Sequence, residues 1–390
     1  MRLTKLFGQF FESEKAGGLI LLFCTALSLL LANSTVGESY VHFWHASVGG
    51  QSVEYWINDG LMTIFFLMIG LELEREIYKG ELSQVRHALF PAIGAIGGMA
   101  LPALLFWLLN KGTAFADGVG IPMATDIAFA LGILSLLGNR VPATLKVFLT
   151  ALAVIDDLGA IMVIAIFYSK GIVLLNLGIA LGLFAVMLVL NRLRMHKLWP
   201  YLILGAGMWY FMLHSGVHAT ISGVLLAFAI PFGSGGPQTI SYKLQSFLHK
   251  PVSFFILPLF ALANTGIIIE SGWTEELTSS ESLGIFTGLV IGKPVGITLC
   301  CLIAVLLKVA SLPQGLKWQH IFGAGILGGI GFTMSIFITL LAFDNPHYIT
   351  TAKIAILLSS LIAAVAGLGW LALFLRERHA PEPLLEDEET

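Results

Sequence analysis

Apolar runs of about 20 residues recur along the whole chain, and short polar stretches separate them. An α-helix needs a run of that length to cross the roughly 30 Å hydrocarbon core of a bilayer. About twelve runs can be recognised, and they begin near Gly17, Trp56, Ala88, Gly118, Val147, Ile172, Leu198, Gly216, Pro251, Leu283, Phe322 and Ala352. The pattern predicts an all-α polytopic membrane protein with about twelve transmembrane helices in a single domain, residues 1–390.

The composition agrees with this class of protein. The chain is 57% hydrophobic and 12% charged, whereas about 25% of residues are charged in an ordinary soluble domain. The net charge of −3 gives no reason to expect a nucleic-acid partner. Cys24, Cys300 and Cys301 lie in apolar runs and offer neither a disulfide framework nor metal-ligand spacing. We therefore expect a lipid-embedded protein that needs no cofactor.

Lysine and arginine are distributed unevenly over the polar segments. Seventeen of the 21 fall in the two tails and in every second loop, whereas the other loops hold only Lys111 and Lys170, with Lys353 at a helix start. Because positive residues favour the cytoplasmic side of a membrane, we predict that both termini are cytoplasmic. Residues 380–390 are acidic and are predicted to be a disordered tail.

The first external segment, 41–56, contains aromatic and β-branched runs on both sides of Gly49 and Gly50. This pattern predicts a β-hairpin with a two-residue turn, and a plain loop is the alternative. A hairpin outside any larger sheet offers a free edge to which a partner subunit can pair.

The fourth and eleventh spans contain residues that interrupt helices. They are Gly118, Gly120 and Pro122, followed by Thr125 and Asp126, and then Gly323, Gly325, Gly328, Gly329 and Gly331, followed by Thr333. Backbone freed inside a bilayer must be satisfied by protein or by a water-lined cavity. Interrupted spans at matching places in two inverted repeats, here 88–168 and 283–375, are typical of a transport site. For the eleventh span alone, close packing of small residues is the alternative.

Four buried charges stand out against the apolar runs. Asp156 and Asp157 are the only charges in 147–168, Lys293 lies alone at the centre of the tenth run, and Asp126 interrupts the fourth. A carboxylate at the bilayer centre costs about 2.5–3.5 kcal/mol, so we expect these groups to have a function. Neighbouring residues point about 100° apart on a helix, so one aspartate can pair with Lys293 while the other lines a cavity.

Carboxylate, hydroxyl and free backbone oxygens together suit a hard cation such as Na⁺. Burial and mutual repulsion favour protonation of the aspartates, so protons and the cation would compete for the same oxygens. We expect Asp157 to be the cation ligand and Asp156 to be either a fixed partner of Lys293 or a proton carrier. Thr125 and Thr333 are predicted to cap the restarted helices, with Asp126 in the first turn near the positive helix end.

Other polar residues are open to two interpretations. His218 is either a packed, hydrogen-bonded residue or part of the ion path. Glu72, Arg75 and Glu76 form either a solvated helix end or a charged funnel that responds to pH. The predicted function is therefore cation/proton antiport by alternating access, and proton-coupled transport of another small solute is the closest alternative. An intramembrane aspartyl protease needs two aspartates that share a proton, and the expected Gly-x-Gly-Asp signature does not occur.

The combination of segments closely resembles the NhaA-type Na⁺/H⁺ antiporters of bacterial inner membranes. The matching segments are ATDIAFA at 124–130, AVIDDLGA at 153–160, GKPVG at 292–296, GIGFTMS at 329–335, WIND at 56–59 and GLE at 70–72. These antiporters are themselves among the examples behind the rule on paired interrupted spans. The resemblance covers essentially the whole chain.

The resemblance implies two crossed, discontinuous helices (spans 4 and 11) and electrogenic exchange of two H⁺ for one Na⁺ or Li⁺, which regulates intracellular pH and sodium. It implies a central site at Asp156 and Asp157, with Asp126 and Lys293 balancing the half-helix dipoles. It also implies a homodimer through the hairpin at 41–56, with 17–73 and 216–269 as the interface panel and 172–213 as linking helices. One departure is Gln245, which is neutral where some family members carry an acid linked to pH sensing. The pH response is therefore expected to depend on Glu72, Glu76 and the central site.

Overall fold

The computed structural model describes residues 5–169, 171–269 and 272–375, and most of them are helical. The first half contains α1 (Lys5–Ala32), α2 (Gly37–His45), β1 (Ser47–Val48), β2 (Gln51–Ser52), α3 (Val53–Tyr55), η1 (Trp56–Leu61), α4 (Met62–Tyr78), η2 (Glu81–Ser83), α5 (Val85–Asn110), η3 (Ala116–Met123), α6 (Ile127–Ser135), η4 (Gly138–Arg140) and α7 (Ala143–Phe167). The second half contains α8 (Leu174–Arg192), α9 (Leu198–Leu213), α10 (Ile221–Ala229), α11 (Ile240–Pro251), η5 (Val252–Ile256), α12 (Leu257–Asn264), α13 (Trp273–Glu276), α14 (Ser280–Phe286), η6 (Thr287–Gly292), α15 (Lys293–Leu306), α16 (Trp318–Gly328), α17 (Phe332–Ala342) and α18 (Pro346–Phe374). The predicted tail at 380–390 lies outside the described residues.

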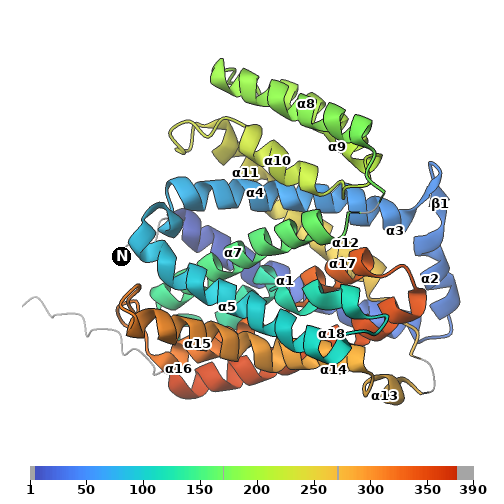
Figure 1. The fold of residues 1–390 in the computed structure, drawn as a ribbon, viewed down its shortest axis with the longest axis vertical. Coiled ribbons are helices and arrows are strands. Elements are labelled where there is room, and N and C mark those ends of the chain that lie inside the picture. Colours follow the sequence, from blue (N-terminus) through green and yellow to red (C-terminus); the bar gives the residue numbers. More distant parts are fainter. Residues whose placement is uncertain (1–4, 170, 270–271, 376–390) are drawn as a thin grey trace, which may run out of the picture.

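Most helices run in roughly the same direction across the molecule, as membrane spans do (Figure 1). Within the described residues, eight helical stretches are long and apolar enough to cross a bilayer, or up to ten if each of two bent pairs is one span. Two further predicted runs form the shorter helices α9 and α10. The all-α, polytopic architecture is therefore confirmed, while the count of twelve spans stays a prediction.

The start of the ninth span was predicted wrongly. The helix begins at Ile240 and continues to Asn264, so Pro251 lies inside it instead of at its start. Proline lacks the N–H that an α-helix needs, and the chain continues past it with a π-helical turn, η5. The segment around Gln245 is consequently helical.

The helices pack in layers around the two interrupted spans. α5 packs along α15, α16 packs against α15 and α18, and α10 packs on α4. α8 and α9 form an outer hairpin beyond α10 (Figure 1). The crossing of α5 and α15 is close because Gly97 and Gly296 face each other: a Cβ on either would collide with the other's carbonyl oxygen.

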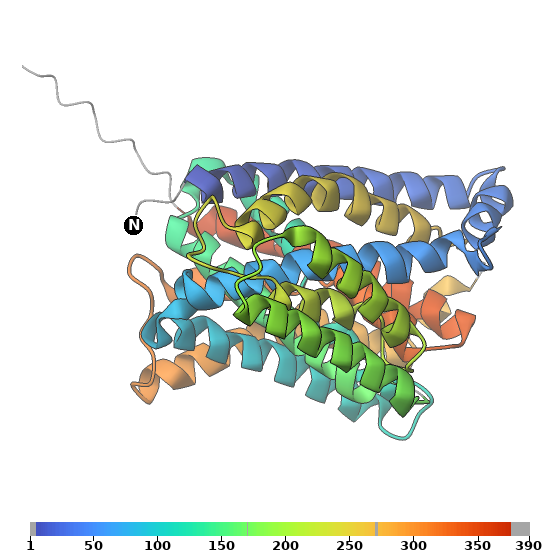
Figure 2. The same cartoon turned by 90° about the horizontal axis from the view of Figure 1, so that it is seen from above.

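The hairpin is present but shorter than predicted. β1 and β2 pair antiparallel, Ser47 with Ser52 and Val48 with Gln51. Gly49 and Gly50 make the turn with φ of +65° and +90°, as a type I′ turn requires. The flanking runs are helical instead of extended: α2 precedes the hairpin, and α3 follows it, capped by Ser52, which accepts a hydrogen bond from the Tyr55 N–H at 3.0 Å. α1 runs the length of the molecule, so the hairpin and the start of α1 lie at opposite ends (Figure 2).

Candidate functional site

The two interrupted spans meet at their breaks. In the fourth span, the 3₁₀ segment η3 gives way to the non-helical residues Ala124 to Asp126 before α6 begins. In the eleventh, α16 and α17 are separated by Gly329 to Gly331 and are bent by 46°. The Asp126 N–H donates to the Ile330 carbonyl oxygen at 2.7 Å, so backbone freed by one break is satisfied by the other.

Asp126 caps both restarted helices. Its Oδ1 accepts from the Phe129 N–H at 2.9 Å, which makes it the N-cap of α6. Its Oδ2 accepts from the Thr333 N–H at 3.1 Å, in the first turn of α17, and from the Thr333 hydroxyl. The prediction that Thr125 and Thr333 are the caps is therefore wrong. A carboxylate has two oxygens and a full charge, so it can serve two positive helix ends where a hydroxyl serves one.

Lys293 and Asp156 form a fully buried ion pair. Lys293 Nζ lies 2.5 Å from Asp156 Oδ2, and both side chains are 0% exposed. Lys293 also donates to the Thr125 hydroxyl at 2.8 Å. The single hydroxyl hydrogen of Thr125 can go to Asp156 Oδ2 (2.8 Å) or to the Gly328 carbonyl oxygen (2.9 Å). α7, α15 and both broken spans are thus joined in one polar network.

Asp157 is the carboxylate without such partners. It is 1% exposed, and neither of its oxygens has a hydrogen-bond donor among the described residues. Asp156 Oδ1 likewise has no donor. The charged groups that act on Asp157 electrostatically are Asp156, Asp126, Glu72 and Lys293. Three acids and one cation surround an acid that lacks donors, so this place favours an added positive charge, either a proton or a metal cation.

The glycines and the proline at the breaks allow the close approach of neighbouring elements. A Cβ at Gly329 would collide with the Leu289 carbonyl oxygen, and one at Gly120 would come within 2.7 Å of the Tyr168 hydroxyl. Pro122 packs against Gly288 of η6, where a Cβ would lie 2.6 Å away. Gly331 is the N-cap residue of α17, although it has no side chain to donate or accept.

The candidate pH-responsive residues occupy two places. Glu72 is only 9% exposed and acts on Asp157, so the interpretation as a solvated helix end is wrong for it. The Arg75 guanidinium lies 5.3 Å from the centre of the Tyr242 ring and so links α4 to α11; Glu76, one residue further, is partly buried. His218 makes a 3.0 Å hydrogen bond with the Tyr168 carbonyl oxygen, at the far end of α7 from Ala143.

Two groups near these residues had no separate role in the sequence analysis, although Glu74 belongs to the same charged helix end as Glu72, Arg75 and Glu76. Glu74 is buried and accepts a 3.5 Å hydrogen bond from Ser241. The Tyr168 hydroxyl accepts from the Gly120 N–H at 3.2 Å and donates to the Asp117 carbonyl oxygen at 2.7 Å. Tyr168 thereby satisfies backbone of η3, and the only sequence signal was its place at the end of an apolar run.

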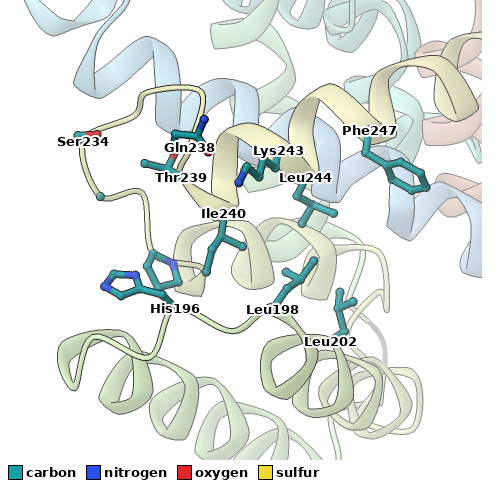
Figure 3. Close-up of a pocket in the computed structure, with 12 residues that line it drawn as sticks. His196, Leu198, Leu202, Ser234, Gln238, Thr239, Ile240, Lys243, Leu244 and Phe247 are labelled. Atoms are coloured by element: carbon teal, nitrogen blue, oxygen red, sulfur yellow. The ribbon is translucent and has the colours of Figure 1, made fainter.

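A groove of about 720 Å³ lies away from these residues, between the α8–α9 turn and the start of α11 (Figure 3). His196, Leu198 and Leu202 line it from the side of the α8–α9 turn and α9, and Lys243, Leu244 and Phe247 line it from α11. None of its lining residues carries a carboxylate, and none belongs to the polar network of the two breaks.

The comparisons with known proteins agree over nearly the whole chain. The sequence model of the family "Na+/H+ antiporter 1" matches residues 8–371. The chain is 62% identical to the Na(+)/H(+) antiporter NhaA of Cytophaga hutchinsonii over 97% of each chain. It is 63% identical to the antiporter of the same name from Flavobacterium psychrophilum, over 94% of this chain and 96% of the relative. The corresponding protein of Dechloromonas aromatica is 59% identical, over 96% and 97%. This chain therefore belongs to the NhaA family of Na⁺/H⁺ antiporters, which are membrane transporters rather than enzymes.

Proposed function

We propose that this protein exports Na⁺ or Li⁺ in exchange for protons, and that the two kinds of ion compete for Asp157 and Asp156. The observation that carries the proposal is the pair of donor-free Asp157 oxygens beside a satisfied Lys293–Asp156 pair. A buried carboxylate in that condition must take up a positive charge. The relatives' names identify Na⁺ and H⁺ as their exchanged ions, and we extend this to the present chain.

Each residue has a distinct part in the proposed exchange. Asp157 binds the cation, with the free Oδ1 of Asp156 as a second carboxylate ligand. Asp126 holds the two helix starts in place and keeps its own charge satisfied. Thr125 connects the ion pair to the Gly328 carbonyl oxygen. A change of charge at Asp156 therefore changes which of the two accepts the Thr125 hydrogen, and so alters the hydrogen bonding at the break of the eleventh span.

The exchange is proposed to be electrogenic, with two protons entering for each Na⁺ that leaves. One proton binds Asp157, and the second is carried either by Asp156 or by Lys293. Either scheme moves one net charge per cycle, which is worth about 2.3 kcal/mol per 100 mV of membrane potential. With the inside negative, the potential drives proton entry and Na⁺ exit.

Competition for one site also supplies pH control. At acid pH protons occupy the carboxylates and transport stalls, whereas at alkaline pH Na⁺ gains access. Glu72 is buried near enough to act on Asp157, and we propose that its charge adjusts the pH at which Na⁺ binds. Arg75, Glu76 and His218 are proposed to contribute indirectly: Arg75 lies against the Tyr242 ring, and His218 hydrogen-bonds to the Tyr168 carbonyl oxygen.

We further propose that the protein lies in a bacterial inner membrane with both termini in the cytoplasm. The uneven distribution of lysine and arginine supports this orientation. A homodimer through the hairpin is proposed because β1 and β2 form a two-stranded sheet whose Val48 side chain is exposed. Proton-coupled transport of another small solute is disfavoured, since the carboxylates are almost completely buried and suit a bare ion.

The test is sodium-driven proton flux out of liposomes that contain the purified protein. A pH-sensitive dye inside reports the flux after Na⁺ is added, over a series from acid to alkaline pH. We expect flux that falls at acid pH and that accelerates when valinomycin and K⁺ remove the opposing potential. The absence of Na⁺-dependent flux at every pH would overturn antiport, and flux that is indifferent to the potential would overturn electrogenic exchange.

A further inference from the structure

A second group of buried polar side chains lies at the other end of the α5–α15 contact. α5 runs antiparallel to the continuous helical stretch Ser280–Leu306, with Gly97 facing Gly296. At the end of α5, Asn110 reaches the first turn of α14, which also carries Glu281. Lys293 is twelve residues beyond Glu281, or about 18 Å along a helix. α14 lies toward the same end of the molecule as the hairpin (Figure 1).

The amide of Asn110 can be oriented without ambiguity. Its Nδ2 donates to the Phe106 and Ser280 carbonyl oxygens, both at 3.0 Å, so both amide hydrogens are used. Turning the amide over would replace two hydrogen bonds with two contacts between oxygens. Asn110 Oδ1 is therefore the atom left over, and it is buried with no donor among the described residues.

Glu281 adds two more oxygens of the same kind. Its side chain is 0% exposed, and neither Oε1 nor Oε2 has a hydrogen-bond donor in the described part of the chain. Three acceptors are thus buried on two packed helices without a donor. Because an unpaired buried carboxylate is costly, such a set needs a positive charge to satisfy it.

The charged groups on the surrounding elements do not supply that charge. Glu276 of α13 is itself acidic and acts electrostatically on Glu281, while accepting a hydrogen bond from Thr351 at 3.0 Å. Lys111, next to Asn110, places its ammonium 5.1 Å from the centre of the Trp107 ring. At this end of the packed elements, the other charged or titratable residues are Asp117 of η3 and His347, Tyr348 and Lys353 of α18. His347 Nδ1 lies 3.9 Å from Glu276, and Lys353 interacts electrostatically with Glu54.

We infer that Glu281 and Asn110 form a second cation-binding site, separate from the aspartate pair, that holds a proton or a sodium ion between α5 and α14. Either ion satisfies the set: a protonated Glu281 gains a hydrogen to donate, and Na⁺ prefers the carboxylate and amide oxygens that are present. The site adjoins the first half of the fourth span, because η3 packs against both α5 and α14. Gly118 of η3 packs against Phe106, one turn before Asn110. An ion held here lies beside the 3₁₀ segment that leads to Asp126.

The experiment uses the full-length protein with Asp157→Asn, which removes the proposed main cation ligand. Binding of radioactive Na⁺ to the purified protein is measured in detergent, with choline as the competing inert cation. Infrared difference spectroscopy over a pH series detects protonated carboxyl groups in the same sample. Glu281→Gln is then added, and Glu276→Gln serves as the matched control because Glu276 is an acid at the same end whose carboxylate already has a donor.

Residual Na⁺ binding that Glu281→Gln abolishes and Glu276→Gln preserves identifies a sodium site. A titrating carboxyl band that disappears only in Glu281→Gln, without Na⁺ binding, identifies a proton site. If neither signal depends on Glu281, the inference is overturned. Asn110→Ala, which removes the third oxygen together with the two hydrogen bonds of the amide nitrogen, weakens whichever signal is present. An unchanged signal would exclude Asn110 from the site. Because these are binding signals measured with the aspartate site disabled, their outcome is independent of whether the protein exchanges ions as proposed.

Discussion

Removing the ammonium of Lys293 should destabilise the protein mainly through the charge it leaves behind. Lys293 Nζ and Asp156 Oδ2 are 2.5 Å apart and completely buried. At an effective dielectric constant of 20, two unit charges at that distance attract by about 7 kcal/mol. Desolvation offsets much of this attraction, so breaking the pair from one side is expected to cost about 3–5 kcal/mol. Lys293→Gln should therefore lower the melting temperature strongly.

The same reasoning predicts that a second substitution restores stability. Asp156→Asn in the Lys293→Gln background removes the orphaned charge and leaves two amides that can hydrogen-bond, so most of the loss should be recovered. Thermal unfolding of the unsubstituted protein, the two single variants and the double variant is measured in detergent at one pH and one salt concentration. The four melting temperatures give the coupling energy between the two residues. Additive losses, with no recovery in the double variant, would refute the view that the pair is held by mutual charge compensation.

Electrogenicity of the single variant separates the two proposed roles of Lys293. If Lys293 carries the second proton, Lys293→Gln in liposomes should lose the dependence of Na⁺ flux on membrane potential. If it only holds Asp156, residual exchange should keep that dependence. The comparison is made on the charge moved per Na⁺, which does not depend on how much folded protein is present.

Three further predictions concern neighbouring positions. Asp157→Asn should abolish Na⁺-driven pH change in everted vesicles without lowering thermal stability, because it removes an acid that has no donor; retained exchange would exclude Asp157 as the cation ligand. Asp126→Asn should lower the free energy of unfolding by about 1.5–3 kcal/mol, since an amide has an acceptor oxygen on only one side. Asn345→Ala, at the cap of α18, should lower it by about 1 kcal/mol. Equal melting temperatures for the two variants would contradict the double-cap arrangement. Gly97→Ala should lower the free energy of unfolding by about 1–3 kcal/mol through overpacking. Gly178→Ala should leave it unchanged, because Gly178 has open space around it. Equal losses in the two variants would argue against the close α5–α15 crossing.

The fold class and the main charged residues could be predicted from the sequence for the same physical reason. A charge inside an apolar run is costly, so Asp126, Asp156, Asp157 and Lys293 were conspicuous against their surroundings. The breaks were equally visible, because clustered glycine and proline have few other uses in a membrane span. These signals are local, and a single sequence contains them.

The details that failed depend on contacts between distant segments. Thr125 and Asp126 are adjacent, and only the path of the backbone decides which of them caps α6. Glu281 lies two residues before the predicted tenth span and therefore resembled an ordinary loop acid. It is buried in a helix, α14, that packs against both α5 and α18. Glu72 was likewise interpreted as part of a solvated helix end because charged residues follow it in the sequence. Its burial depends instead on the elements that pack on α4.

Asp126 is a single attachment point for two helices from the two predicted repeats. Because its two oxygens hold the starts of α6 and α17, neither start can swing away without breaking hydrogen bonds to the other. We therefore expect the starts of α6 and α17 to move together in any change of conformation. We expect this link to disfavour any conformation that is open to both sides of the membrane, through which ions would leak.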